Sequence, residues 1–221
     1  MTWARIHRWL ALGLLVPLAV WSVTGLLFHW RLGWDRAYDQ LTADRGATLE
    51  PRALVAPGAL ALTSPRKLEL FDTALGPLWR VTTAAGRELH DARTGQRRPL
   101  LTAAEARILA LDAIARSPHA AAYGEVRAVE EGADEVRLRF AGGPVVTVGR
   151  ADARLAQHGP DTDRIDGWYR LHYLQWTGHR GVDRALALVG LAWIWAVVGP
   201  GMVLFVRAIR RRRPAPAAAR P

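Results

Sequence analysis

Two uncharged, apolar stretches decide the architecture of this chain: WLALGLLVPLAVWSVTGLLF at residues 9–28 and ALALVGLAWIWAVVGPGMVLFV at residues 185–206. A helix needs ~20 apolar residues to cross the ~30 Å hydrocarbon core of a bilayer. A cleaved signal peptide is the alternative for the first stretch, but its apolar run exceeds the usual ~7–15 residues and no small-residue cleavage site follows it. A buried helix of a soluble protein is the alternative for the second, and the arginine cluster directly after it argues against this. We therefore predict two transmembrane helices.

The charges separate by position along the chain. The 30 basic and 20 acidic residues give a net charge of +10, but every acidic residue lies between Asp35 and Asp183. The tails before and after the apolar stretches carry arginines and no acid. Short basic flanks stay in the cytoplasm, whereas long loops cross regardless of charge. We therefore expect both termini in the cytoplasm and the centre in a bacterial periplasm or its equivalent, with the lipid bilayer, not nucleic acid, as the partner of the basic tails.

The central segment has the pattern of two similar α+β halves. A capping box at Thr102–Glu105 opens a helix that is expected to run to about Arg116. A weaker helix is expected at about 52–62, where Pro57 interrupts the pattern. Runs of strand-forming residues follow each helix, at 67–71, 78–83 and 87–91 and then at 125–130, 135–140 and 145–148. The predicted fold class is membrane α plus α+β: two transmembrane helices flanking a periplasmic domain of two helix-plus-three-strand antiparallel units.

Three segments resemble the family of PepSY-associated transmembrane proteins: RIHRWLALGLLVPLAVWSVTGLLFHW (5–30), ELHDARTGQ (88–96) and RLHYLQWTGHRGVDR (170–184). The resemblance implies a bacterial inner-membrane protein with a PepSY-like periplasmic domain, and a helix that approaches the last span. The expected segments are a cytoplasmic N-terminus at 1–8, a transmembrane helix at 9–30, the PepSY-like domain at 31–168, the approach helix at 169–184, a second transmembrane helix at 185–206 and a cytoplasmic basic tail at 207–221.

The resemblance also implies a cofactor, because some members of the family resemble ferric-siderophore or other reductases that carry b-type haem between histidines on their helices. Larger members have additional spans. A scheme that draws ligands from more than two helices therefore needs a homodimer or a larger membrane complex of this chain. On the cytoplasmic side only His7 is available as a ligand, so two haems in one chain are not expected.

Four histidines flank the spans: His7, His29, His172 and His179. Neutral imidazole is the usual axial ligand of b-type haem. His7 and His29 stand about 33 Å apart on a straight helix, one at each membrane surface. We expect His29 with His172 or His179 to be the iron ligands. The alternative is that these histidines are ordinary amphipathic residues of the membrane interface.

Other side chains near these histidines fit the same hypothesis. Trp30 and Trp176 could wall a planar ring, and Arg31, Arg180 and Arg184 could meet its propionates. Cysteine is absent, which excludes disulfides, thiolate zinc sites, iron–sulfur clusters and thiol nucleophiles. No metalloprotease, esterase, P-loop or dinucleotide motif is present.

Two functions from different classes remain open. The first is membrane-associated electron transfer through haem b, serving reduction of a metal or metal-chelate in the periplasm. The second is a non-enzymatic, membrane-anchored binding or regulatory module, or an accessory subunit, that acts on a peptidase, transporter or sensor.

Overall fold

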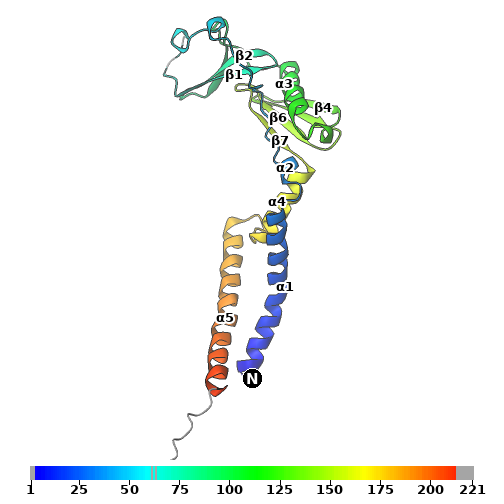
Figure 1. The fold of residues 1–221 in the computed structure, drawn as a ribbon, viewed down its shortest axis with the longest axis vertical. Coiled ribbons are helices and arrows are strands. Elements are labelled where there is room, and N and C mark those ends of the chain that lie inside the picture. The colour runs from blue at the N-terminus through cyan, green and yellow to red at the C-terminus, as the bar shows by residue number, and fades with distance from the viewer. Residues whose placement is uncertain (1–2, 61, 63, 213–221) are drawn as a thin grey trace, which may run out of the picture. The chain divides into compact units, whose positions relative to one another are not determined.

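The computed structural model describes residues 3–60, 62 and 64–212, and these form two compact units (Figure 1). The helical unit extends to Leu32 and resumes at Ile165; the sheet unit comprises Gly33–Arg164. Two long apolar helices therefore flank a central region that contains two antiparallel sheets. This is the predicted order of elements.

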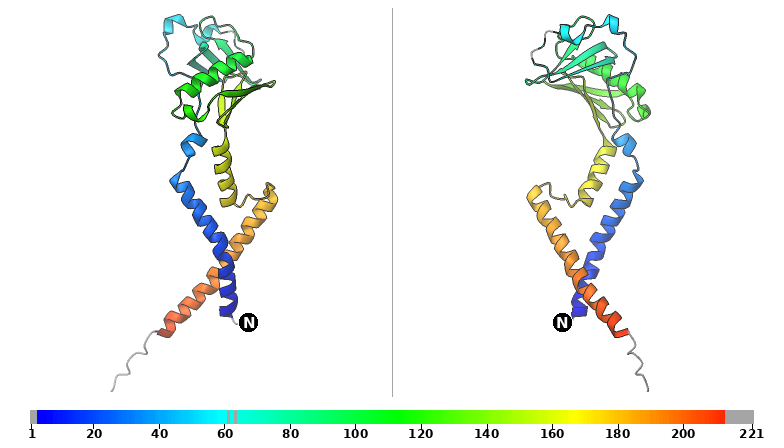
Figure 2. Two further views of the ribbon diagram at one scale, coloured as in Figure 1. Left: turned by 90° about the vertical axis from the view of Figure 1, so that its right-hand side faces the viewer. Right: turned by 60° about the vertical axis from the view of Figure 1, so that its left-hand side comes forward.

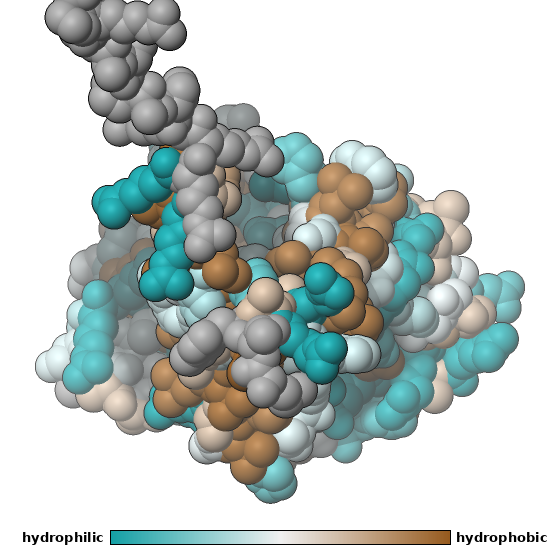
Figure 3. Space-filling view, turned by 90° about the horizontal axis from the view of Figure 1, so that it is seen from below, coloured by the Kyte–Doolittle hydropathy of each residue, from teal (hydrophilic) through white to brown (hydrophobic). Residues whose placement is uncertain are grey.

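The helical unit is built on α1 (Trp3–Trp30) and α5 (Arg180–Arg212). Both are long and apolar enough to cross a membrane by length and composition. Most large apolar side chains of these helices are exposed, and apolar patches are visible when the molecule is viewed from below (Figure 3). The two helices cross (Figure 2), and at the crossing Trp193 Nε1 donates to the carbonyl oxygen of Leu10 over 3.2 Å. Gly13 permits this approach, because a Cβ there would lie 2.8 Å from Trp193 Cζ2.

The sheet unit contains a three-stranded and a four-stranded antiparallel sheet. The first has the order β1 (Lys67–Thr73), β2 (Gly76–Thr82), β3 (Arg87–Asp91). The second has the order β4 (Val126–Glu131), β5 (Glu135–Phe140), β6 (Val145–Gly149), β7 (Leu155–His158). A short α2 (Trp34–Ala37) precedes them, and the 3₁₀ turn η3 (Ala120–Ala122) lies between α3 and β4.

One core joins both sheets to helix α3 (Ala103–Arg116). The helix begins at the predicted capping box, since Thr102 Oγ1 accepts from the N–H of Glu105 while the Glu105 carboxylate accepts from the N–H of Thr102. Its apolar face buries Leu109 against residues of both sheets, including Leu89 and Leu138. The two sheets therefore stabilise each other through one shared core rather than folding as independent repeats.

The expected helix at 52–62 is wrong for the residues that the structure describes in that range, which exclude residue 61. Two 3₁₀ turns occur instead, η1 (Pro51–Ala53) and η2 (Pro57–Ala59). Proline lacks the N–H that a helix interior needs and disfavours helical geometry in the residue before it. The segment instead packs on the first sheet, where the N–H of Val55 donates to the Ala92 carbonyl over 2.8 Å. The idea of two identical helix-plus-three-strand units therefore fails in its first half.

The second half of the central segment has one strand more than expected, because β7 adds a fourth strand to its sheet. Both edges of this sheet are modified. A bulge interrupts β4 between Val126 and Ala128. On β7, the Gln157 amide donates to the carbonyl oxygens of Arg36 and Ala37 over 2.9 and 2.7 Å.

The expected helix at 169–184 is interrupted. Helix α4 (Pro160–His172) starts earlier, and α5 begins only at Arg180. Between them, Leu174 and Gly178 have φ angles of +55° and +73°. These left-handed conformations are incompatible with a continuous α-helix.

Candidate functional site

The four histidines singled out from the sequence lie in different surroundings of the helical unit. His7, on α1, packs against Gly201 of α5, and its buried Nδ1 has no hydrogen-bond partner among the described residues. His29 is exposed on α1, and His179 is exposed just before α5. His172 is the last residue of α4 and is half-buried. Of the four, His172 has the most specific contacts.

One face of α1 receives the His172 ring. Trp21 stacks on it with ring centroids 5.4 Å apart, and Phe28 meets it edge-on at 5.0 Å. Between these two positions, Thr24 Oγ1 lies 2.9 Å from His172 Nδ1. Positions 21, 24 and 28 are spaced by three and four residues, which places them on the same side of a helix. A Cβ on Gly25 would be 3.5 Å from His172 Cε1, an ordinary van der Waals contact, so the ring also lies against this position of α1.

The hydrogen bond to Thr24 defines which nitrogen of His172 is available. The Thr24 hydroxyl donates to the carbonyl oxygens of Val20, over 2.9 Å, and Trp21, over 3.0 Å. With its single proton used in this way, its oxygen is the acceptor for Nδ1–H of His172, which lies 2.9 Å away. In the neutral ring the lone pair is then on Nε2. Metal-ligating histidines have this arrangement, with one ring nitrogen donating to a fixed oxygen and the other free for the metal.

A second ligand is not assembled around His172 within one chain. No hydrogen bond or ring contact joins His29 or His179 to the His172 ring in the part of the chain that the structure describes. The described residues also contain no group of three or more His, Cys, Asp or Glu side chains placed for a metal ion. Of the histidines singled out from the sequence, His172 is the one whose Nε2 would be available to hold an iron, and the described residues bring no second ligand to it.

The flanking residues proposed from the sequence are exposed. Arg31 follows α1 with a φ of +50°, Arg180 begins α5, and Arg184 lies one turn further along. Trp30 is 60% exposed. The Trp176 indole N–H donates to the Leu171 carbonyl over 3.2 Å, so this side chain is held by its own loop.

Sequence reasoning missed the residues that surround His172. Trp21, Thr24 and Phe28 come from α1, while Tyr169 stacks on Phe28 with centroids 4.7 Å apart. The available signal was a threonine between two aromatic residues at helical spacing in an otherwise aliphatic span. Their partner, His172, is 148 residues away from Thr24 in sequence.

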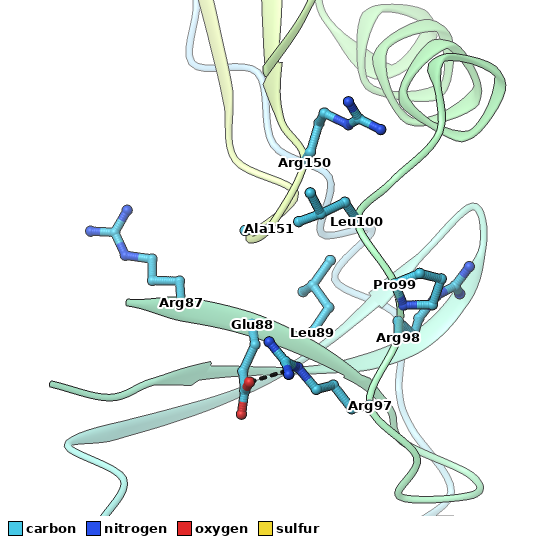
Figure 4. A pocket seen from close by; sticks show the side chains of 9 residues that line it. All are labelled: Arg87, Glu88, Leu89, Arg97, Arg98, Pro99, Leu100, Arg150 and Ala151. Atoms are coloured by element: carbon cyan, nitrogen blue, oxygen red, sulfur yellow. Dashed lines mark ion pairs between the residues drawn. The ribbon is translucent and has the colours of Figure 1, made fainter. Parts of the chain in front are cut away.

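A separate groove of about 520 Å³ lies in the sheet unit (Figure 4). Its floor includes Leu89, Leu100 and Ala151, and four arginines surround it. Figure 4 shows the side chains of Arg87 and Arg150 extending away from each other rather than converging. Each of the four has a carboxylate partner: Arg87 pairs with Asp152, Arg97 with Glu88, Arg98 with Glu105 and Arg150 with Glu131. The groove is therefore an apolar strip with a ring of paired charges.

The turn next to this groove is held by local hydrogen bonds. Asp91 Oδ1 accepts from the backbone N–H groups of Arg93 and Thr94, both over 2.9 Å, which forms an Asx-type turn. Partial burial raises the pKa of Asp91, but these donors outweigh it and the net shift is downward. The buried His90 ring bonds to the Gly95 carbonyl at 3.2 Å and to Glu88 at 3.1 Å. His90 is thus committed to holding the turn.

Comparison with known proteins adds no family to this geometry: no family model, no curated protein and no solved structure matches the chain.

Proposed function

We propose that this chain is a bacterial inner-membrane protein of the PepSY-associated type that takes part in electron transfer through a b-type haem. The observation that carries the proposal is the environment of His172. Its Nδ1–H is committed to Thr24, so Nε2 is the nitrogen that would bind iron. Haem held there would carry one electron at a time, and reduction of a metal or metal-chelate in the periplasm is the reaction that we propose it serves.

The protein's own residues would position and insulate the ligand. Thr24 fixes the rotation of the imidazole about its ring axis, and Trp21 and Phe28 restrict water on two sides of it. The exposed guanidinium groups of Arg31 and Arg180 would supply positive charge for propionates at the membrane surface. The basic tails favour a topology with both termini in the cytoplasm and the sheet unit in the periplasm.

An absorption spectrum tests this proposal directly. The full chain, expressed with haem supplementation and purified in detergent, should show a Soret band and reduced-minus-oxidised α-bands. His172→Ala should abolish these bands or change them to those of a different spin state, whereas His158→Ala should leave them unchanged, because His158 lies in the sheet unit and pairs with Asp163. Absence of a Soret band from the wild-type protein would refute haem binding.

Separate substitutions identify the second ligand. Loss of one axial histidine changes the spin state of the iron while the other still holds it. His29→Ala and His179→Ala are therefore each compared with the wild type. If neither alters the spectrum, the second position is filled from another copy of the chain or by a ligand other than these histidines.

The groove of the sheet unit favours a second candidate function, a membrane-anchored binding or regulatory module. Leu100 is 48% exposed on its apolar strip, which would give a partner an apolar contact surrounded by ion pairs. Complementation of a deletion strain separates the two functions. The electron-transfer function requires His172, whereas the binding function should survive the double substitution His29→Ala/His172→Ala at normal protein levels. Loss of complementation by Leu100→Asp alone would favour the binding module.

A further inference from the structure

The contacts of His172 locate the end of α4 relative to α1. His172 bonds to Thr24 and packs on Phe28, and both residues belong to the uncharged stretch 9–28. The first charged residue after that stretch is Arg31, seven residues beyond Thr24. At a rise of ~1.5 Å per residue, Thr24 lies about 10 Å below Arg31 along the helix. The end of α4 therefore reaches well below the level of the charged flank of α1.

An independent contact with α5 gives a similar depth. Leu174 Cδ1 lies 3.9 Å from the position that a Cβ on Gly190 would occupy. Gly190 follows Arg184, the last charged residue before the uncharged stretch of α5, by six residues, which corresponds to about 9 Å along the helix. Both long helices thus place residues 172–174 inside the apolar zone rather than above it.

The segment at this depth has an interfacial composition. Residues 171–178, LHYLQWTG, contain no charged side chain and are bracketed by Arg170 and Arg180. Three of their apolar or aromatic side chains are exposed: Leu171 is 40% exposed, Tyr173 58% and Trp176 55%. Tyrosine and tryptophan favour the headgroup region of a bilayer, where an apolar ring and a polar atom are both accommodated.

The backbone of the segment is also suited to a medium poor in water. Non-helical backbone near the hydrocarbon requires internal hydrogen bonds. The N–H of Tyr173 donates to the Tyr169 carbonyl over 2.9 Å, and that of Gln175 donates to the Arg170 carbonyl over 2.8 Å. Further along, the N–H of Thr177 donates to Asp183 over 3.1 Å. Three backbone N–H groups of the break between α4 and α5 therefore have acceptors within the helical unit.

We propose that residues 171–178 form an interfacial segment that enters the outer leaflet beside α1 and α5, with Leu171, Tyr173 and Trp176 in contact with lipid. The occupant of this surface is the bilayer itself, because the exposed apolar side chains are continuous with the apolar surfaces of both long helices at the same depth. The inference rests on the proposed membrane-spanning role of α1 and α5, but not on haem binding.

Cysteine scanning tests the proposal, because the chain has no cysteine and a single introduced thiol is unique. Leu171→Cys, Tyr173→Cys and Trp176→Cys are reconstituted in liposomes of phosphatidylcholine and phosphatidylglycerol. Ala104→Cys, exposed in the sheet unit, serves as the control in water, and Val16→Cys, which is 71% exposed in the middle of α1, as the control in lipid. A charged, membrane-impermeant maleimide should react with the three segment thiols about tenfold more slowly than with the water control, since both reagent and thiolate avoid lipid.

A nitroxide spin label collides with oxygen and with a water-soluble nickel chelate at rates that show whether lipid or protein surrounds it. Labels at 171, 173 and 176 should favour oxygen over a water-soluble nickel chelate, with ratios between those of the two controls. Because three different sites are tested, the result does not depend on any single variant that fails to fold. Reaction of all three thiols within twofold of the Ala104→Cys rate, while Val16→Cys stays protected, would overturn the inference and leave the spans intact. Exclusion of both oxygen and nickel would also overturn it, because the cover would then be a second copy of the chain. Rapid reaction of Val16→Cys with the maleimide would instead contradict the membrane-spanning role of α1.

Discussion

Replacement of Gly142 by alanine should severely destabilise the sheet unit. A Cβ at this position would overlap the carbonyl oxygen of Ala122 and lie 3.0 Å from that of Tyr123. Relief requires the turn to move, but the N–H of Gly142 is bonded to Tyr123 and that of Ala141 to Glu125, both over 2.8 Å. Breaking two such bonds costs ~0.5–1.5 kcal/mol each, and forced overpacking adds ~1–3 kcal/mol, so the loss is roughly 2–6 kcal/mol.

Thermal unfolding of the full chain in detergent, followed by intrinsic fluorescence, measures this loss. For a unit of this size the melting temperature of the sheet unit should fall by roughly 6–20 °C. Gly58→Ala is the matched control, because nothing lies within 4 Å of its Cβ position. A Gly142→Ala protein that melts with the wild type and the control would refute the steric argument. Hydrogen exchange should localise the weakened amides to the turn between β5 and β6.

Two further perturbations probe the other unit and the surface of α3. Gly13→Ala should weaken the packing of α1 on α5 by ~1–3 kcal/mol, because its Cβ would press on the rigid Trp193 ring. Unfolding by SDS titration measures this loss. Gly199→Ala is the control, because nothing lies within 4 Å of its Cβ position. For Asp112, a hydrogen bond from Arg45 lowers the pKa from 3.8. The resulting stabilisation is present above that ordinary value and is lost as pH falls through the lowered pKa of the folded state. Asp112→Asn should therefore melt below the wild type at pH 7 but approach it at pH 3, and an equal difference at both pH values would contradict this assignment.

Local signals predicted the elements that depend on neighbouring residues. The capping box at Thr102 and the alternating strand at 135–140 both form as expected. The hydrogen bonds of the capping box join residues three apart, and the alternation of buried and exposed side chains repeats every two residues, so both can be read from a short stretch of sequence. The helix expected at 52–62 failed because Pro57, in the middle of the range, outweighed its apolar content. Strand β7 was missed because four residues are too few to establish a period.

The surroundings of His172 depend on long-range packing, so the sequence predicted the histidine but not its partner. His172 could be selected because it precedes an apolar stretch and imidazole is a good ligand. Its bond to Thr24 could not be predicted, since nothing in either segment specifies that α4 returns to that level of α1. The interruption at Leu174 and Gly178 also breaks the expected helix at 169–184 between His172 and His179.

The bulge at one edge of the four-stranded sheet would have a consequence under the proposed anchoring in a bilayer. Anchored copies would be confined to two dimensions in a common orientation, so identical strand edges would meet far more often than in free solution. The bulge in β4 interrupts the straight ladder that a neighbouring strand would need. The β4 edge is thus a poor template for strand pairing with a second copy.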